Sequence, residues 1–84
     1  MNIELLYFGR PRERLQRSRE TLVVPDDLTT LDALLSWLRA RGGEWEAALA
    51  HDHVRCAINQ RHCEIKDTIC DHDEIAIFSP ISGG

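Results

Sequence analysis

A chain of 84 residues, of which 43% are hydrophobic and 29% charged, fits one small globular domain and excludes a disordered or fibrous protein. No apolar run approaches the roughly 20 residues of a membrane span. Met1 is not followed by the basic and apolar stretches of a signal peptide. We therefore expect a cytoplasmic protein without a membrane partner. The net charge of −4 argues against nucleic acid as the main partner.

Two strands separated by a basic loop are expected first. Residues 3–8 alternate between two faces, and residues 20–24 are rich in β-branched side chains. Gly9 and Pro11 end the first strand and open a loop that contains five arginines. These are Arg10, Arg12, Arg14, Arg17 and Arg19. The loop could dock an acidic partner or a phosphate group, or it could be merely solvated.

A helix with a leucine stripe is expected next. The stripe follows helical spacing and consists of Leu31, Leu34, Leu35 and Leu38. Residues 29–32 resemble a capping box, and Gly42 and Gly43 supply a stop signal. Residues 45–49 predict one or two further helical turns. We interpret the stripe as core, because one such helix can cover one face of a small sheet.

Short strands are expected in the last third of the chain. Residues 54–59 predict a third strand, followed by a turn near 59–62 and a short edge strand at 63–65. Residues 74–79 predict the last strand, after a tight turn in which His72 has to adopt a left-handed conformation.

This order of elements predicts an α+β protein of the β-grasp, or ubiquitin-like, type. Its mixed sheet would have four to five strands and be covered on one face by one main helix. The first and last strands would lie side by side and parallel, with Glu4 and Glu74 at one end of the solvent face and Phe8 and Phe78 at the other. Two aromatic residues there suggest a partner surface, unless the Arg-rich loop folds over Phe8.

The last residues predict a tail that another protein can accept. The domain would span residues 1–80, and residues 81–84 would form a flexible extension that ends in Gly83 and Gly84. Without Cβ atoms, the two glycines could enter a channel too narrow for side chains and present the terminal carboxylate. The alternative is a frayed terminus without a role.

The cysteines predict neither a metal site nor disulfides. Cys56, Cys63 and Cys70 are an odd set, and they lack the C-x-x-C knuckle of structural zinc sites. Cys56 shares strand parity with Val54 and Ile58, as expected for a small buried side chain.

Several segments in order resemble the small subunit of molybdopterin synthase, a family of ubiquitin-like sulfur carriers. The resemblance covers essentially the whole chain, and its most specific piece is the C-terminal one. The matching segments are Phe8-Gly9-x-x-Arg12-Glu13, Thr30-Leu31-x-Ala33-Leu34, Ala57-Ile58-Asn59-Gln60, Asp71 to Phe78, and Pro80-Ile81-Ser82-Gly83-Gly84.

The resemblance implies a carrier subunit that is not an enzyme on its own and binds no cofactor. An activating, adenylyltransferase-type partner would use ATP to adenylate Gly84, and a cysteine desulfurase and a sulfurtransferase would supply the sulfur of a thiocarboxylate. Gly83 would permit entry into the large subunit, which holds the catalytic residues. There the carrier would donate sulfur to cyclic pyranopterin monophosphate, within a heterotetramer. Partner-binding roles would fall to Phe8, Phe78, Pro80, Ile81, Ser82 and Arg12.

Other functions stay open at this point. A carrier of the same chemistry could serve thiamine thiazole or a thiolated tRNA base. A ubiquitin-like modifier would join Gly84 to a target lysine, although this chain has a single lysine of its own, Lys66. A plain interaction module would tolerate residues added after Gly84.

Overall fold

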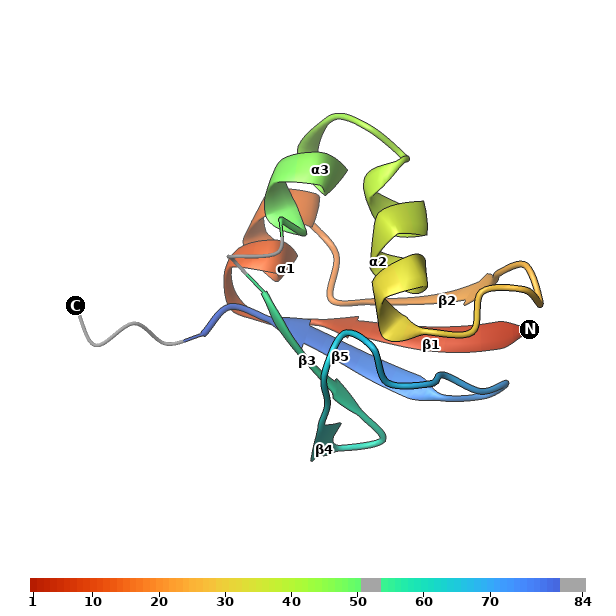
Figure 1. The fold of residues 1–84 in the computed structure, drawn as a ribbon. Helices are drawn as coiled ribbons and strands as arrows, with labels where there is room; N and C mark the ends of the chain where they lie inside the picture. The colour runs from red at the N-terminus through yellow and green to blue at the C-terminus, as the bar shows by residue number, and fades with distance from the viewer. Residues whose placement is uncertain (51–53, 81–84) are drawn as a thin grey trace.

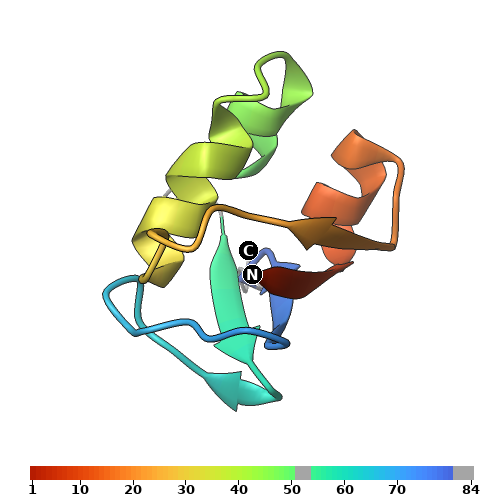
Figure 2. The ribbon, with the colours of Figure 1, turned by 90° about the vertical axis from the view of Figure 1, so that its right-hand side faces the viewer.

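A computed structural model of the protein describes residues 1–50 and 54–80, which form a sheet with helices on one side of it (Figures 1 and 2). The strands in this part of the chain are β1 (Asn2–Tyr7), β2 (Arg19–Val23), β3 (Arg55–Ile58), β4 (Arg61–His62) and β5 (Glu74–Phe78). The helices are α1 (Gly9–Leu15), α2 (Leu31–Arg39) and α3 (Glu44–Ala48).

The sheet has the mixed topology that the sequence predicts. Its strand order is β2-β1-β5-β3-β4, and β1 pairs in parallel with β5 while the other neighbours are antiparallel. The register places Glu4 beside Glu74 and Tyr7 beside Ile77. β2 and β3 therefore run in the same direction, and the path through α2 and α3 is a parallel crossover over the helical side (Figure 1). This is the β-grasp arrangement.

The core lies between the sheet and α2, as the alternation of apolar residues predicts. The inward residues of the two central strands and the leucine stripe are each 0–1% exposed. They are Ile3, Leu5, Tyr7, Ile75, Ile77, Leu31, Leu34, Leu35 and Leu38. Each such side chain contributes about 1.5–3 kcal/mol by leaving water, so this cluster is the main source of stability.

α2 begins one residue later than the capping-box prediction requires. Thr30 is the N-cap, and its Oγ1 accepts a hydrogen bond from the backbone N–H of Ala33 at 3.2 Å. The residue three positions after the cap is thus an alanine, which has no side-chain acceptor to return the bond. The box predicted at residues 29–32 is wrong, and a threonine cap alone starts the helix.

The prediction of a loop after β1 is wrong, because residues 9–15 form α1. Gly9, at φ 61°, turns the chain out of β1, and Pro11 lies in the first helical turn. A proline is tolerated there because the first N–H groups of a helix have no intrahelical partner. Pro11 is buried and Leu15 is partly buried, so α1 packs on the domain through these two residues.

The short edge strand lies at Arg61–His62 and not at residues 63–65. Asn59 and Gln60, with φ of 52° and 70°, form the two-residue turn that joins it to β3, since both central residues of a type I′ turn need positive φ. The predicted left-handed conformation of His72 is confirmed, with φ 69°.

Candidate docking surface beside the C-terminal tail

The face of the sheet away from the helices has an apolar centre. Across three neighbouring strands, the register aligns Leu6 with Ala76 and Ala76 with Ala57, and all three side chains are only partly buried. Residues of the opposite parity form the core, so this row exists because β1, β3 and β5 also carry an apolar residue on the outward face at these register positions. In a strand that faces water on this side, polar residues alternate with the apolar residues of the core.

Phe8 and Phe78 extend the apolar centre to the end of the sheet where the chain leaves the domain. The backbone N–H of Phe8 donates to the carbonyl oxygen of Ile77 at 3.0 Å, so the β1–β5 ladder continues to these residues. Phe8 is 47% exposed, and Phe78 is partly buried. The alternative that the basic segment folds over Phe8 is therefore wrong.

His62 and Arg55 frame Phe78 on this face, and the sequence prediction did not include them. The rings of His62 and Phe78 meet edge to face, with centroids 6.1 Å apart, and Arg55 is the register partner of Phe78. His62 reaches this position because the two-residue turn aligns it with Ala57. A two-residue turn at residues 59–60 fixes this register, but Asn59 and Gln60 lack the glycine by which such a turn is recognised in a sequence. We call Leu6, Phe8, Ala57, Ala76, Phe78 and His62 the open-face patch.

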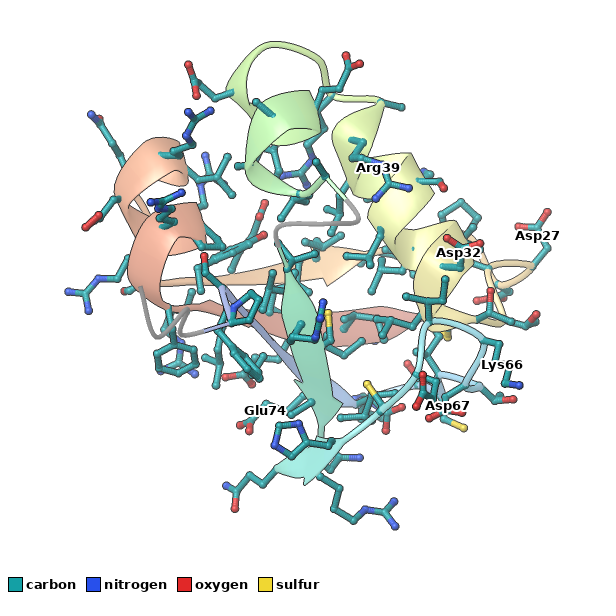
Figure 3. The ribbon with its side chains drawn as sticks, turned by 60° about the vertical axis from the view of Figure 1, so that its left-hand side comes forward. Asp27, Asp32, Arg39, Lys66, Asp67 and Glu74 are labelled. Carbon is teal, nitrogen blue, oxygen red and sulfur yellow. The ribbon has the colours of Figure 1, made fainter. Side chains whose placement is uncertain are left out.

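The opposite end of the open face is acidic. Glu4 and Glu74 are direct neighbours in the parallel ladder, and like charges in this position repel each other. Arg19 forms an ion pair with Glu4 and offsets part of the repulsion. Figure 3 labels Glu74 at this end of the sheet. The open face thus runs from two carboxylates to two aromatic rings.

Of the predicted partner-binding residues, four lie within the described part of the chain. Phe8 and Phe78 come together, and Pro80 is exposed directly after β5. Arg12 is exposed on α1. Ile81, Ser82, Gly83 and Gly84 lie outside the described residues, so their predicted roles stay predictions.

A polar cluster holds α3 against the sheet on the helical side. The hydroxyl of Tyr7 donates to Glu20 at 3.1 Å, Arg41 donates to the same carboxylate at 3.1 Å, and Arg41 lies over the ring of Trp45 at 4.4 Å. Burial raises the pKa of Tyr7, and the nearby carboxylate adds to this. Burial alone would raise the pKa of Glu20, but the hydrogen bond and charge of Arg41, with Tyr7 and Arg17, lower it overall. These contacts stabilise the end of the sheet at which β5 ends and the tail begins.

The described residues hold no candidate metal site. Within residues 1–50 and 54–80, no three His, Cys, Asp or Glu side chains gather in a way that could hold an ion. The cysteines are free thiols, and burial raises the pKa of Cys56 to about 12, which keeps this thiol protonated. In the same ranges, no helix is long and apolar enough to cross a membrane.

The fold is that of a β-grasp domain, and the open-face patch gives it partly exposed apolar residues at the end of the sheet where β5 ends. The model of the ThiS family matches residues 5–84, and the chain belongs to this family. Two relatives share the name molybdopterin synthase sulfur carrier subunit. The one from Haemophilus influenzae is 30% identical over 82 residues, covering 98% of this chain and 99% of the relative. The one from Chlamydomonas reinhardtii is 33% identical over 88 residues, covering both chains fully.

Solved structures support the same fold. A putative molybdopterin converting factor subunit 1 from Pyrococcus furiosus superimposes with a TM-score of 0.77 at 19% identity, over 96% of this chain and 99% of the other. The crystal structure of SAMP1 from Haloferax volcanii has a TM-score of 0.75 at 22% identity over both whole chains. A complex of subunits 1 and 2 of molybdopterin-converting factor from Helicobacter pylori matches with a TM-score of 0.67 at 18% identity, again over both whole chains. These likenesses establish the β-grasp fold.

Proposed function

We propose that this chain is the sulfur-carrier small subunit of molybdopterin synthase, working in the cytoplasm. The observation that carries the proposal is its similarity, from one end to the other, to carrier subunits of that enzyme. The position of the open-face patch supports it. A partner that takes in the tail has to meet the surface from which the tail departs, and that surface presents Phe8 and Phe78.

The chemistry takes place on the carboxylate of Gly84. A carboxylate is a poor electrophile, so the activating partner first lets a carboxylate oxygen attack the α-phosphate of ATP, and pyrophosphate leaves. Sulfide, released by a thiol reductant from the persulfide of a cysteine desulfurase or sulfurtransferase, then attacks the carbonyl carbon, and the bond to AMP breaks. The resulting thiocarboxylate holds nucleophilic sulfur on a tether, which raises its effective concentration at the acceptor.

The acceptor in this proposal is cyclic pyranopterin monophosphate, bound in the large subunit. The contribution of this chain is to dock, to direct the tail and to carry the sulfur, while the acid–base groups belong to the large subunit. In the heterotetramer that we propose, two carriers bind a dimer of large subunits, each through its open-face patch. Phe8 and Phe78 supply apolar area, and Gly83 and Gly84 supply a backbone without side chains.

The test is the intact mass of the chain after incubation with an activating enzyme, ATP and a sulfur source. Replacement of one oxygen by sulfur at Gly84, followed by transfer to the pterin on addition of the large subunit, is the expected result. Two matched controls are deletion of Gly84 and addition of one alanine after it, which both move the terminal carboxylate by one residue and leave residues 1–83 unchanged. An active extended variant would refute the proposal.

Transfer to a different acceptor would identify a carrier for thiamine thiazole or tRNA thiolation. An isopeptide bond from Gly84 to a lysine of another protein, without sulfur incorporation, would instead identify a modifier. Both outcomes contradict the pterin pathway, and the mass of the product separates them.

A further inference from the structure

The charge of the chain is divided very unevenly between one segment and the rest. Residues 10–19 contain five arginines and one glutamate, a net charge of +4, whereas the remaining residues contain five basic and thirteen acidic side chains, a net charge of −8. A basic segment in an acidic chain directs the protein toward partners of opposite charge. The open-face patch makes no use of this segment.

The structure separates the five arginines into two groups. Arg17 pairs with Glu20 at 3.2 Å and lies over Trp45 at 5.2 Å, and Arg19 pairs with Glu4, so both of these guanidinium groups already have a partner within the domain. Within the described residues, Arg10 and Arg12 form no ion pair. Arg14 contacts Glu44 at 3.4 Å, but both side chains are more than half exposed, and such a pair contributes little. Three guanidinium groups are therefore available to a partner.

Arg10 and Arg14 lie together at the root of the tail. Four residues apart on α1, they project on the same side of the helix, where like charges repel each other. Together with Ala47, Ala48, Ala50 and Ser79, they line a shallow pocket of about 200 Å³. Ser79 is the residue after β5, and Pro80 follows it. Nitrogen-tipped side chains project outward from α1 in Figure 3. The two charges are thus concentrated where the chain leaves the domain.

We propose that Arg10 and Arg14 bind carboxylates on the rim of the channel by which the large subunit of molybdopterin synthase accepts the tail. This inference rests on the proposed function. Five residues, 80–84, span at most about 17 Å, so a protein that encloses Gly84 has to come within about 17 Å of Pro80, which follows the pocket residue Ser79. Guanidinium groups form paired hydrogen bonds with carboxylates, and the positive charges of Arg10 and Arg14 fit an acidic rim.

The phosphates of a nucleotide fit this position less well. A nucleotide that reacts with Gly84 lies at the far end of the tail, up to about 17 Å from the pocket that Arg10, Arg14 and Ser79 line. An acidic rim around the channel entrance, by contrast, would contact Arg10 and Arg14 while Gly84 lies inside the channel. The arginine contact is also continuous with the open-face patch, since Phe8 is the N-cap of α1 and Arg10 follows two residues later.

The open-face patch and the two arginines then affect different steps of binding. The open-face patch buries apolar area and sets the lifetime of the complex, whereas Arg10 and Arg14 attract the acidic rim over a distance and set the association rate. Contact on both sides of the departing strand also fixes the direction in which the tail enters.

The experiment compares association rates of the large subunit with the whole carrier and with Arg10→Gln/Arg14→Gln. Glutamine keeps an unbranched polar side chain, although a shorter one, and removes both charges. The matched control is Arg61→Gln/Lys66→Gln, which loses the same charge from exposed positions elsewhere; Figure 3 shows Lys66 beside the start of α2, far from α1. Stopped-flow rates are measured between about 0.01 M and about 1 M salt, over which the screening length falls from ~30 Å to ~3 Å.

We expect the Arg10/Arg14 variant to associate about tenfold more slowly at low salt, with a flatter salt dependence and a nearly unchanged dissociation rate. The control variant should have the same association rate and salt dependence as the unaltered carrier. Equal rates for the Arg10/Arg14 variant and the unaltered carrier would overturn this inference and leave the proposed function intact. An equal loss in the control would overturn it as well. If the unaltered carrier does not bind the large subunit at all, both proposals fail.

Discussion

Replacement of Phe8 by alanine tests whether the open-face patch is a docking surface. A phenylalanine side chain has about 200 Å² of surface, and at 47% exposure roughly 90 Å² of it faces solvent. Complete burial of this area by a partner, at ~25 cal/mol per Å², contributes about 2 kcal/mol. We therefore expect Phe8→Ala to weaken binding of the large subunit by roughly 30-fold in Kd, measured by isothermal titration calorimetry.

The buried half of Phe8 also stabilises the domain, so the experiment needs a control with the same exposure. Ile65 is 46% exposed and lies beyond the open-face patch, in the loop after β4. Both alanine variants should lose about 1–2 kcal/mol of unfolding free energy in urea, but only Phe8→Ala should bind more weakly. Unchanged binding by Phe8→Ala would refute the assignment, and so would an equal loss of binding by Ile65→Ala.

Two further predictions concern stability. Glu20→Gln should lower the unfolding free energy by about 1–3 kcal/mol at neutral pH, because it removes the carboxylate that Tyr7, Arg17 and Arg41 contact. The folded-state pKa of Glu20 is lowered, so this stabilisation is complete above the unfolded-state pKa and disappears as the pH falls through the folded-state pKa. Urea titrations of both proteins at about pH 7 and about pH 3 measure it. If the two proteins differ by the same unfolding free energy at both pH values, the ion pairs do not stabilise the domain. His72→Gly should raise the unfolding free energy by up to about 1 kcal/mol, since glycine adopts φ 69° without the strain of a Cβ. A lower melting temperature by calorimetry would show that the exposed contact of His72 with Asp71 outweighs the strain.

The sequence predicts the centre of this fold well because the centre is periodic. Alternation along residues 3–8 and 74–79 defines the inward faces of β1 and β5, and helical spacing of leucines defines α2. The same alternation places Phe8 and Phe78 on the outward face, so the two phenylalanines of the open-face patch follow from residue spacing alone.

The elements that were missed depend on local exceptions. Gly9 and Pro11 usually interrupt structure, yet here the glycine turns the chain into α1 and the proline occupies a first turn in which its missing N–H costs nothing. Asn59 and Gln60 form a tight hairpin turn without glycine, so the register that brings His62 to Phe78 is not visible in the residue types. The separation of structural from available arginines depends on tertiary ion pairs, which no spacing predicts.

The parallel pairing of β1 with β5 has a consequence for the order of events in the cell. The two neighbouring strands at the centre of the sheet come from opposite ends of the chain, since Glu4 pairs with Glu74. A nascent polypeptide therefore lacks the middle of its sheet until residues 74–78 have been synthesised, and such long-range strand pairing is a slow folding step. Phe8 and Phe78 meet only after that closure. A partner that binds both rings thus selects chains in which β5 has paired with β1, and does not bind fragments that end before residue 78.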